Sequence, residues 1–76
     1  MKYIRFVESG FLIFSGAITH KHAGKLVNEE ILSAGFVGQH KDGLRCYGQS
    51  ETLHLKSDPA DTDLLRSQIR RMRNES

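Results

Sequence analysis

Five side chains in this sequence could bind a transition metal: His20, His22, His40, His54 and Cys46. Imidazole nitrogens and thiolate sulfurs are the ligands that zinc and related metals prefer. His20 and His22 are separated by one residue, and side chains two positions apart on a helix point about 200° away from each other. Both could bind one metal only if this segment were extended or unwound. We therefore expect solvated histidines near a helix start, and neither a metal nor a cofactor.

Cys46 could also act as a nucleophile, because a thiol with a histidine and an acid nearby is the minimum set for thiol catalysis. The pattern of apolar residues around Cys46 places its side chain toward the core, where a thiol is not activated. Ser50 and Glu51 lie near His54, but their spacing matches neither a nucleophile elbow nor a phosphate-binding glycine loop. The sequence therefore predicts a protein that is not an enzyme.

Arginines near the end of the chain form the best candidate binding site. Arg66 and Arg70 are four residues apart, and Arg73 follows three residues later, so a helix would place the three guanidinium groups on one stripe. Such a stripe could contact phosphates, and an exposed Tyr47 could stack on a base. Arginines in the last turns also complement the helix dipole and keep a half-buried helix in solution, which is the simpler explanation.

The elements that would position these residues begin with a hairpin. Apolar and polar residues alternate over residues 2–7, Ser9-Gly10 supplies a turn, and an apolar run follows over residues 11–14. Thr19 can cap a short helix over residues 20–27. Gly24 weakens that helix, and close packing against a strand would explain a glycine there.

A second hairpin is predicted over the central segment, where two strand registers compete. A two-residue turn at Asp42-Gly43 would mix polar and apolar side chains on both faces. A three-residue loop over residues 41–43 places Gly38 opposite Cys46, gathers the apolar side chains on one face and leaves Tyr47 on the other. We expect the second register.

Residues 52–56 alternate again and predict a fifth strand. A second helix is predicted to begin at Asp58-Pro59, because an acidic cap followed by proline is typical of a helix start. Leu65, Ile69 and Met72 then recur at helical spacing. The expected fold is α+β, with the order ββαβββα, an antiparallel sheet of about five strands and both helices on one face.

Length and composition restrict the remaining possibilities. With 76 residues, the chain is expected to form one small domain over residues 1–76. A single cysteine excludes an internal disulfide, and a net charge of +2 names no partner. No apolar run approaches the ~20 residues of a membrane span, and no secretory segment follows Met1. We therefore expect a cytoplasmic protein with no membrane partner.

Self-association is expected as well, because a domain of this size is marginally stable alone. Two copies could pair through a strand at a sheet edge, either the strand over residues 2–7 or the last strand.

Several segments resemble a family of short uncharacterised bacterial proteins, often found in prophages and in mobile DNA such as integron gene cassettes. The matching residues are Thr19-His20, Ser33-Ala34-Gly35-Phe36-Val37, Cys46-Tyr47-Gly48-Gln49-Ser50 and Leu55-Lys56-Ser57, followed by Pro59 and Asp61. The resemblance covers the last three quarters of the chain. It implies no catalytic or binding residue, because the family has no established activity.

The leading hypothesis from the sequence is a small cytoplasmic interaction module that forms a homo-oligomer, such as a dimer, and binds a protein partner without covalent chemistry. The alternative is a nucleic-acid-binding accessory protein that uses Arg66, Arg70 and Arg73, with Tyr47 as a stacking residue.

Overall fold

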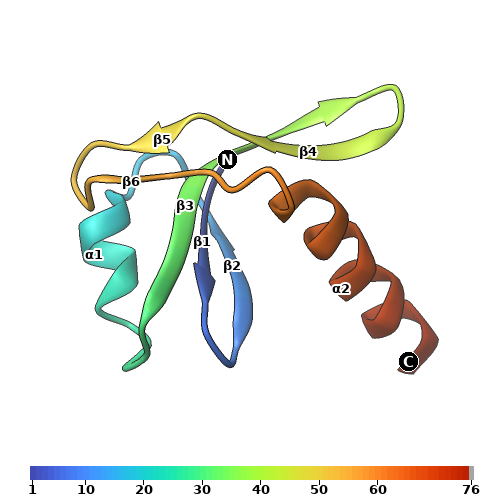
Figure 1. Ribbon diagram of the computed structural model, residues 1–76, viewed down its shortest axis with the longest axis horizontal. Helices are drawn as coiled ribbons and strands as arrows, with labels where there is room; N and C mark the ends of the chain where they lie inside the picture. The colour runs from blue at the N-terminus through green and yellow to red at the C-terminus, as the bar shows by residue number, and fades with distance from the viewer. Residues whose placement is uncertain (76) are drawn as a thin grey trace.

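Two antiparallel sheets and two helices make up the fold (Figure 1), as seen in a computed structural model that describes residues 1–75. The four-stranded sheet has the order β2-β1-β3-β4, and the two-stranded sheet pairs β5 with β6. The α+β class is confirmed, whereas the expected strands divide between two sheets. The elements are β1 (Lys2–Phe6), β2 (Gly10–Phe14), α1 (His20–Gly24), β3 (Ile31–His40), β4 (Gly43–Tyr47), β5 (Gln49–Ser50), β6 (Leu55–Lys56) and α2 (Asp61–Glu75).

The first hairpin forms as the alternation predicted, with Lys2 opposite Phe14 and Phe6 opposite Gly10. Its first strand does not lie at a sheet edge, because β1 pairs with β2 on one side and with β3 on the other. The prediction that β1 offers an edge to a second copy is therefore wrong. The physical reason is that the ten-residue strand β3 pairs with β1 from Lys2 to Phe6, so the backbone groups on both edges of β1 have strand partners.

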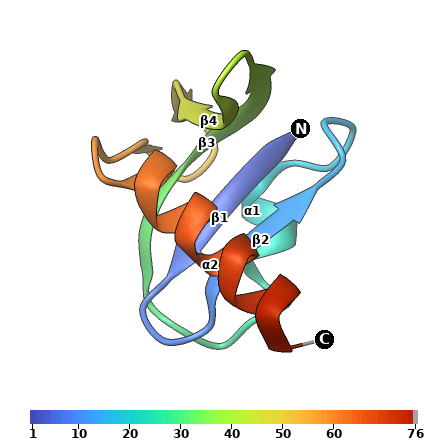
Figure 2. The same cartoon turned by 90° about the vertical axis from the view of Figure 1, so that its right-hand side faces the viewer.

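The two helices cover opposite faces of the four-stranded sheet, which corrects the expectation that both lie on one face. Ile4 and Phe6 of β1 pack in a core cluster with Ala23 of α1, while Tyr3 packs in a second cluster with Leu65 of α2. Figure 2 shows α2 in front of the sheet and α1 behind it. Each face of the sheet therefore has its own small core.

Helix α1 is shorter than predicted, since it ends at Gly24. Its cap is confirmed, because the hydroxyl of Thr19 accepts a hydrogen bond of 3.1 Å from the backbone N–H of His22. A Cβ added at Gly24 would lie 3.2 Å from the side chain of Ile31 on β3. Close packing on a strand, as expected, explains the glycine.

The central hairpin adopts neither of the two registers considered from the sequence. His40 pairs with Gly43 around a two-residue turn at Lys41-Asp42, so Val37 lies opposite Cys46. The expected pairing of Gly38 with Cys46 is wrong by one residue. The prediction assumed one apolar face, but helices on both sides of the sheet allow apolar residues on both faces of the hairpin.

The last predicted strand is reduced to the two residues of β6, because residues 51–54 form a turn and His54 has a positive φ of 56°. Helix α2 begins at Asp61, two residues after Pro59. Within residues 1–75, no helix combines the length and the apolar character needed to cross a membrane.

Candidate functional site

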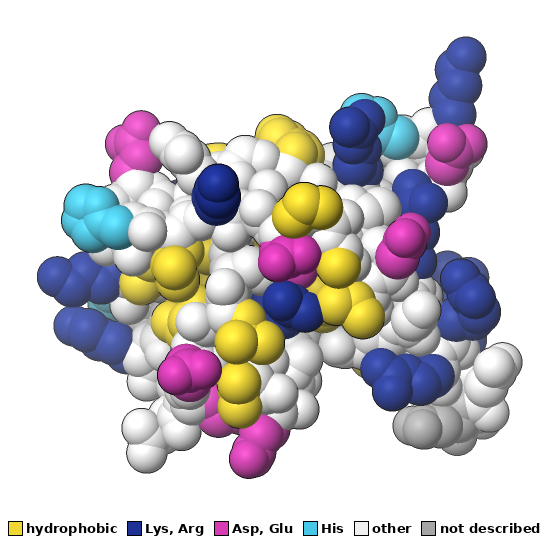
Figure 3. Space-filling model, in the orientation of Figure 1, with side chains coloured by type: hydrophobic (Ala, Val, Ile, Leu, Met, Phe, Trp, Pro, Cys, Tyr) yellow, Lys and Arg dark blue, Asp and Glu magenta, His cyan; other side chains and the backbone are white. Residues whose placement is uncertain are grey.

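The three arginines singled out from the sequence line one hollow, which we call the arginine groove. This hollow of about 320 Å³ lies between α2 and the β3–β4 hairpin. Figure 3 shows Lys and Arg side chains gathered on this side of the molecule, over the hairpin and along α2. The groove is lined by Arg66, Arg70 and Arg73 together with Gln39, Asp42, Gly43, Leu44 and Ile69.

Side chains of α2 hold the helix against β4. The backbone N–H of Cys46 donates to the hydroxyl of Thr62 at 3.0 Å, and Nε of Arg66 donates to the carbonyl oxygen of Leu44 at 2.9 Å. Thr62 and Arg66 are four residues apart and so lie on one helix face. One edge of the arginine groove is therefore a fixed joint between helix and strand.

At the other outer strand, the backbone N–H of Phe11 on β2 donates to the side-chain oxygen of Gln68 at 3.1 Å. The same helix therefore makes hydrogen bonds with both outer strands of the four-stranded sheet. Unpaired backbone groups at a sheet edge invite pairing with another chain. Side chains of α2 form hydrogen bonds with several of these backbone groups.

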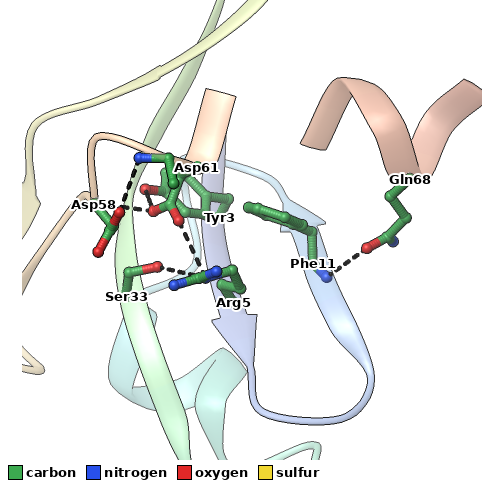
Figure 4. A network of polar contacts seen from close by, with 8 residues as sticks. Tyr3, Arg5, Phe11, Ser33, Asp58, Asp61 and Gln68 are labelled. Atoms are coloured by element: carbon green, nitrogen blue, oxygen red, sulfur yellow. Dashed lines mark hydrogen bonds and ion pairs between the residues drawn. The ribbon is translucent and has the colours of Figure 1, made fainter. Parts of the chain in front are cut away.

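A buried polar cluster of Tyr3, Arg5, Ser33 and Asp61 anchors the start of α2 (Figure 4). The Tyr3 hydroxyl donates to Oδ2 of Asp61 at 2.5 Å, and Nε of Arg5 lies 3.1 Å from Oδ1. The backbone N–H of Asp58 also donates to Oδ2, and Arg5 donates to the Ser33 hydroxyl. A fully buried carboxylate needs this many partners, because an isolated charge would be costly to remove from water.

The electrostatics of the cluster suppress acid and nucleophile chemistry. Burial and the hydrogen bond to Asp61 raise the pKa of Tyr3 far above its ordinary value. Burial, followed by the charge of Asp61, raises the pKa of the Cys46 thiol to about 11. Since the thiolate is the nucleophile, a raised pKa disfavours nucleophilic chemistry by Cys46 at neutral pH. Cys46 is buried as expected and packs in the core cluster that contains Leu65 of α2.

Tyr47 does not line the arginine groove. Its ring stacks on Phe36, with centroids 5.9 Å apart and an angle of 28° between the ring planes. Cys46, the preceding residue of β4, packs in the core cluster of α2, and successive side chains of a strand point to opposite faces. Tyr47 therefore lies on the other face of the hairpin, where it is exposed.

Two of the candidate metal ligands, His20 and His22, differ in burial. The expectation of solvated histidines is wrong for His20, which is buried. Its Nε2 lies 2.8 Å from the carbonyl oxygen of Gly35, so that nitrogen acts as the donor. His22 is exposed two residues later. Among residues 1–75, no three His, Cys, Asp or Glu side chains are grouped to hold a metal ion.

Sequence reasoning missed the buried polar cluster. Tyr3 and Asp61 are 58 residues apart, and the alternation around Tyr3 predicted only a strand. It also missed Glu29, whose carboxylate accepts hydrogen bonds from Ser9 and from the backbone of Glu8, which lower its pKa. For Asp61 the sequence carried one local signal, because an acid near Pro59 at a helix start often has a capping role.

No family model, curated protein or solved structure matches this chain. The resemblance to short proteins of bacterial mobile DNA therefore stays a prediction. The arrangement of the arginine groove and of the exposed tyrosine is the basis for a functional proposal.

Proposed function

We propose that this protein binds nucleic acid through the arginine groove and performs no covalent chemistry. The observation that carries the proposal is the convergence of Arg66, Arg70 and Arg73 on one hollow against the β3–β4 hairpin. Guanidinium groups present several N–H donors in a planar fork that fits the oxygens of phosphate. A row of them is suited to a phosphate backbone.

The balance of charge in the groove favours a polyanion. Asp42 is the one acidic side chain among the described residues that line it, against three arginines. Dipole compensation alone would leave the arginines in solvent, yet Arg66 is fixed to β4 by its bond to Leu44. A guanidinium held in place loses less conformational entropy when it binds a phosphate.

Pairing of two copies through a sheet edge receives less support. The edge of β2 is bonded to Gln68 and the edge of β4 to Thr62 and Arg66. The last strand, β6, does lie at an edge, but it has two residues. Self-association and a protein partner stay predictions, and light scattering that shows a monomer at micromolar concentration would exclude the homo-oligomer.

The proposal is tested by measuring affinity for a fluorescent oligonucleotide across a range of salt concentrations. The double variant Arg70→Gln/Arg73→Gln removes two groove charges and keeps the bond between Arg66 and Leu44. For a single strand, the slope of log affinity against log salt should decrease by about 1.4, because each phosphate contact contributes about 0.7.

The matched control is Lys25→Gln/Arg71→Gln, which removes two positive charges that do not line the groove. Its slope should stay close to that of the unmodified protein. Equal slopes for the two double variants, or an unmodified protein that binds no nucleic acid at low salt, would contradict the proposal.

A further inference from the structure

The β3–β4 hairpin carries a second hollow beside Tyr47, which we call the aromatic hollow. It measures about 540 Å³, within the range of small-molecule sites. Two aromatic side chains and several polar ones surround it, including Lys2, His20, Phe36, Tyr47, Gln49 and Thr52. The arginine groove shares none of these residues.

The aromatic side chains at this hollow contact one another in series. Tyr47 stacks on Phe36, and Phe36 meets His20 edge to face with ring centroids 5.8 Å apart. His20 in turn contacts the buried ring of Phe14 in a second edge-to-face pair at 5.4 Å. A continuous series of rings thus runs from the core to the surface, and it ends at a tyrosine that is 48% exposed.

The backbone beside the rings keeps the hollow open. Gly48 has a φ of +75°, and a Cβ there would lie 3.0 Å from the ring of Phe36. Glycine therefore lets the chain turn from β4 into β5 without a side chain against Phe36. The same turn brings Gln49 to the rim of the hollow, where its amide can donate and accept hydrogen bonds.

We propose that the aromatic hollow binds an unpaired base, which makes single-stranded nucleic acid the ligand of this protein. This inference rests on the proposed function, since the arginine groove would hold the phosphates. An exposed aromatic ring stacks on any base whose face is free, and bases within a duplex are stacked on each other. Gln49 lines the same hollow and has an amide that can bond the edge of a base, whereas the Thr52 hydroxyl already accepts from the backbone N–H of Lys21.

Charge on this face fits the same ligand. Arg45 lies two residues before Tyr47 on β4, so both side chains point to one face of the hairpin, and Arg45 is exposed. Lys2 lines the hollow while its ammonium group donates to the carbonyl oxygen of Ile18. Glu51 is the acidic member of the lining. A strand that passes around the hairpin would meet positive charge on both faces.

The test compares three probes of equal length: a single-stranded oligonucleotide, a duplex and an abasic strand that carries phosphates without bases. Tyr47→Ala should weaken binding of the single strand by about 10-fold, the effect typical of one lost stacked base. Binding of the duplex and of the abasic strand should not change. Tyr47→Phe keeps the ring and should retain most of the affinity.

The outcomes separate this inference from the proposed function. If Tyr47→Ala binds the single strand as tightly as the unmodified protein, the base site is excluded, and the arginine groove is still tested by the abasic strand. If Tyr47→Ala weakens all three probes alike, the substitution acts on the fold and the inference is overturned. If the unmodified protein does not bind the abasic strand, the proposed binding of phosphates by the arginine groove is contradicted.

Discussion

The two halves of α2 contrast with each other. At its start, Asp61 is fully buried beneath Tyr3 and Arg5, and Leu65 lies in the core. Its later turns carry two exposed arginines of the arginine groove, Arg70 and Arg73. The contrast teaches that one helix can be fixed at one end by a buried charge and offer binding chemistry at the other. Substitutions in the two halves should therefore affect different measurements.

The largest expected effect is that of Asp61→Ala on folding. The substitution leaves the half-buried Arg5 and the buried hydroxyl of Tyr3 without their partner. Removing one member of a buried ion pair costs about 3–5 kcal/mol of unfolding free energy, which urea unfolding would measure. Asp63 lies in the same turn but is exposed, and Asp63→Ala should cost under about 1 kcal/mol. Similar losses for the two variants would remove the distinction between the halves.

The second-largest expected effect is a loss of unfolding free energy at alkaline pH. Cys46 has a pKa of about 11 in the folded protein and an ordinary value of 9.0, so the folded state holds its proton more tightly. The stabilisation is complete below pH 9 and is lost as pH rises toward 11, by about 3 kcal/mol in all. Urea unfolding between pH 8 and 10 would show the decline. In Cys46→Ala the unfolding free energy should change little over this interval. If the variant shows the same decline as the unmodified protein, other groups cause the decline.

A smaller loss is expected for Tyr3→Phe. The ring is kept, but Oδ2 of Asp61 then accepts only from the backbone of Asp58 among the described residues. The variant therefore loses one hydrogen bond to a charged group, which costs about 1.5–3 kcal/mol. Tyr47→Phe provides the control, because Tyr47 is exposed and its hydroxyl is expected to contribute less than about 0.5 kcal/mol. Thermal or urea unfolding of both variants would show whether the buried hydroxyl matters more than the exposed one.

The smallest effect on stability belongs to the basic half. Arg70 is exposed and lines the arginine groove, so Arg70→Gln should change the unfolding free energy by less than about 0.5 kcal/mol. Its effect should appear as weaker nucleic-acid binding and a smaller salt slope. A large loss of stability with unchanged binding would reverse the roles of the two halves.

Local patterns predicted some parts of this arrangement well. The first hairpin and the Thr19 cap depend on residues that are close in sequence, and both formed as expected. The clustering of Arg66, Arg70 and Arg73 followed from helical spacing alone. These features can be predicted without knowing which elements pack against them.

The register of the central hairpin could not be predicted in the same way. Pairing Val37 with Cys46 is favoured because α2 covers that face, and nothing within the hairpin reveals that cover. The choice of one apolar face was reasonable for a sheet covered on one side, but it fails when helices lie on both sides.

The sequence by itself determined the α+β class, the first hairpin, the helix cap and the arginine stripe, because each follows from periodicity or from neighbouring residues. Only the tertiary structure decided which strands lie inside the sheet, which face each helix covers and where the buried polar cluster forms. Tyr3 meets Asp61 across 58 residues, and the pairing of Val37 with Cys46 depends on the helix that covers that face. These features arise from long-range packing and from the need to pair a buried charge, which local spacing does not encode.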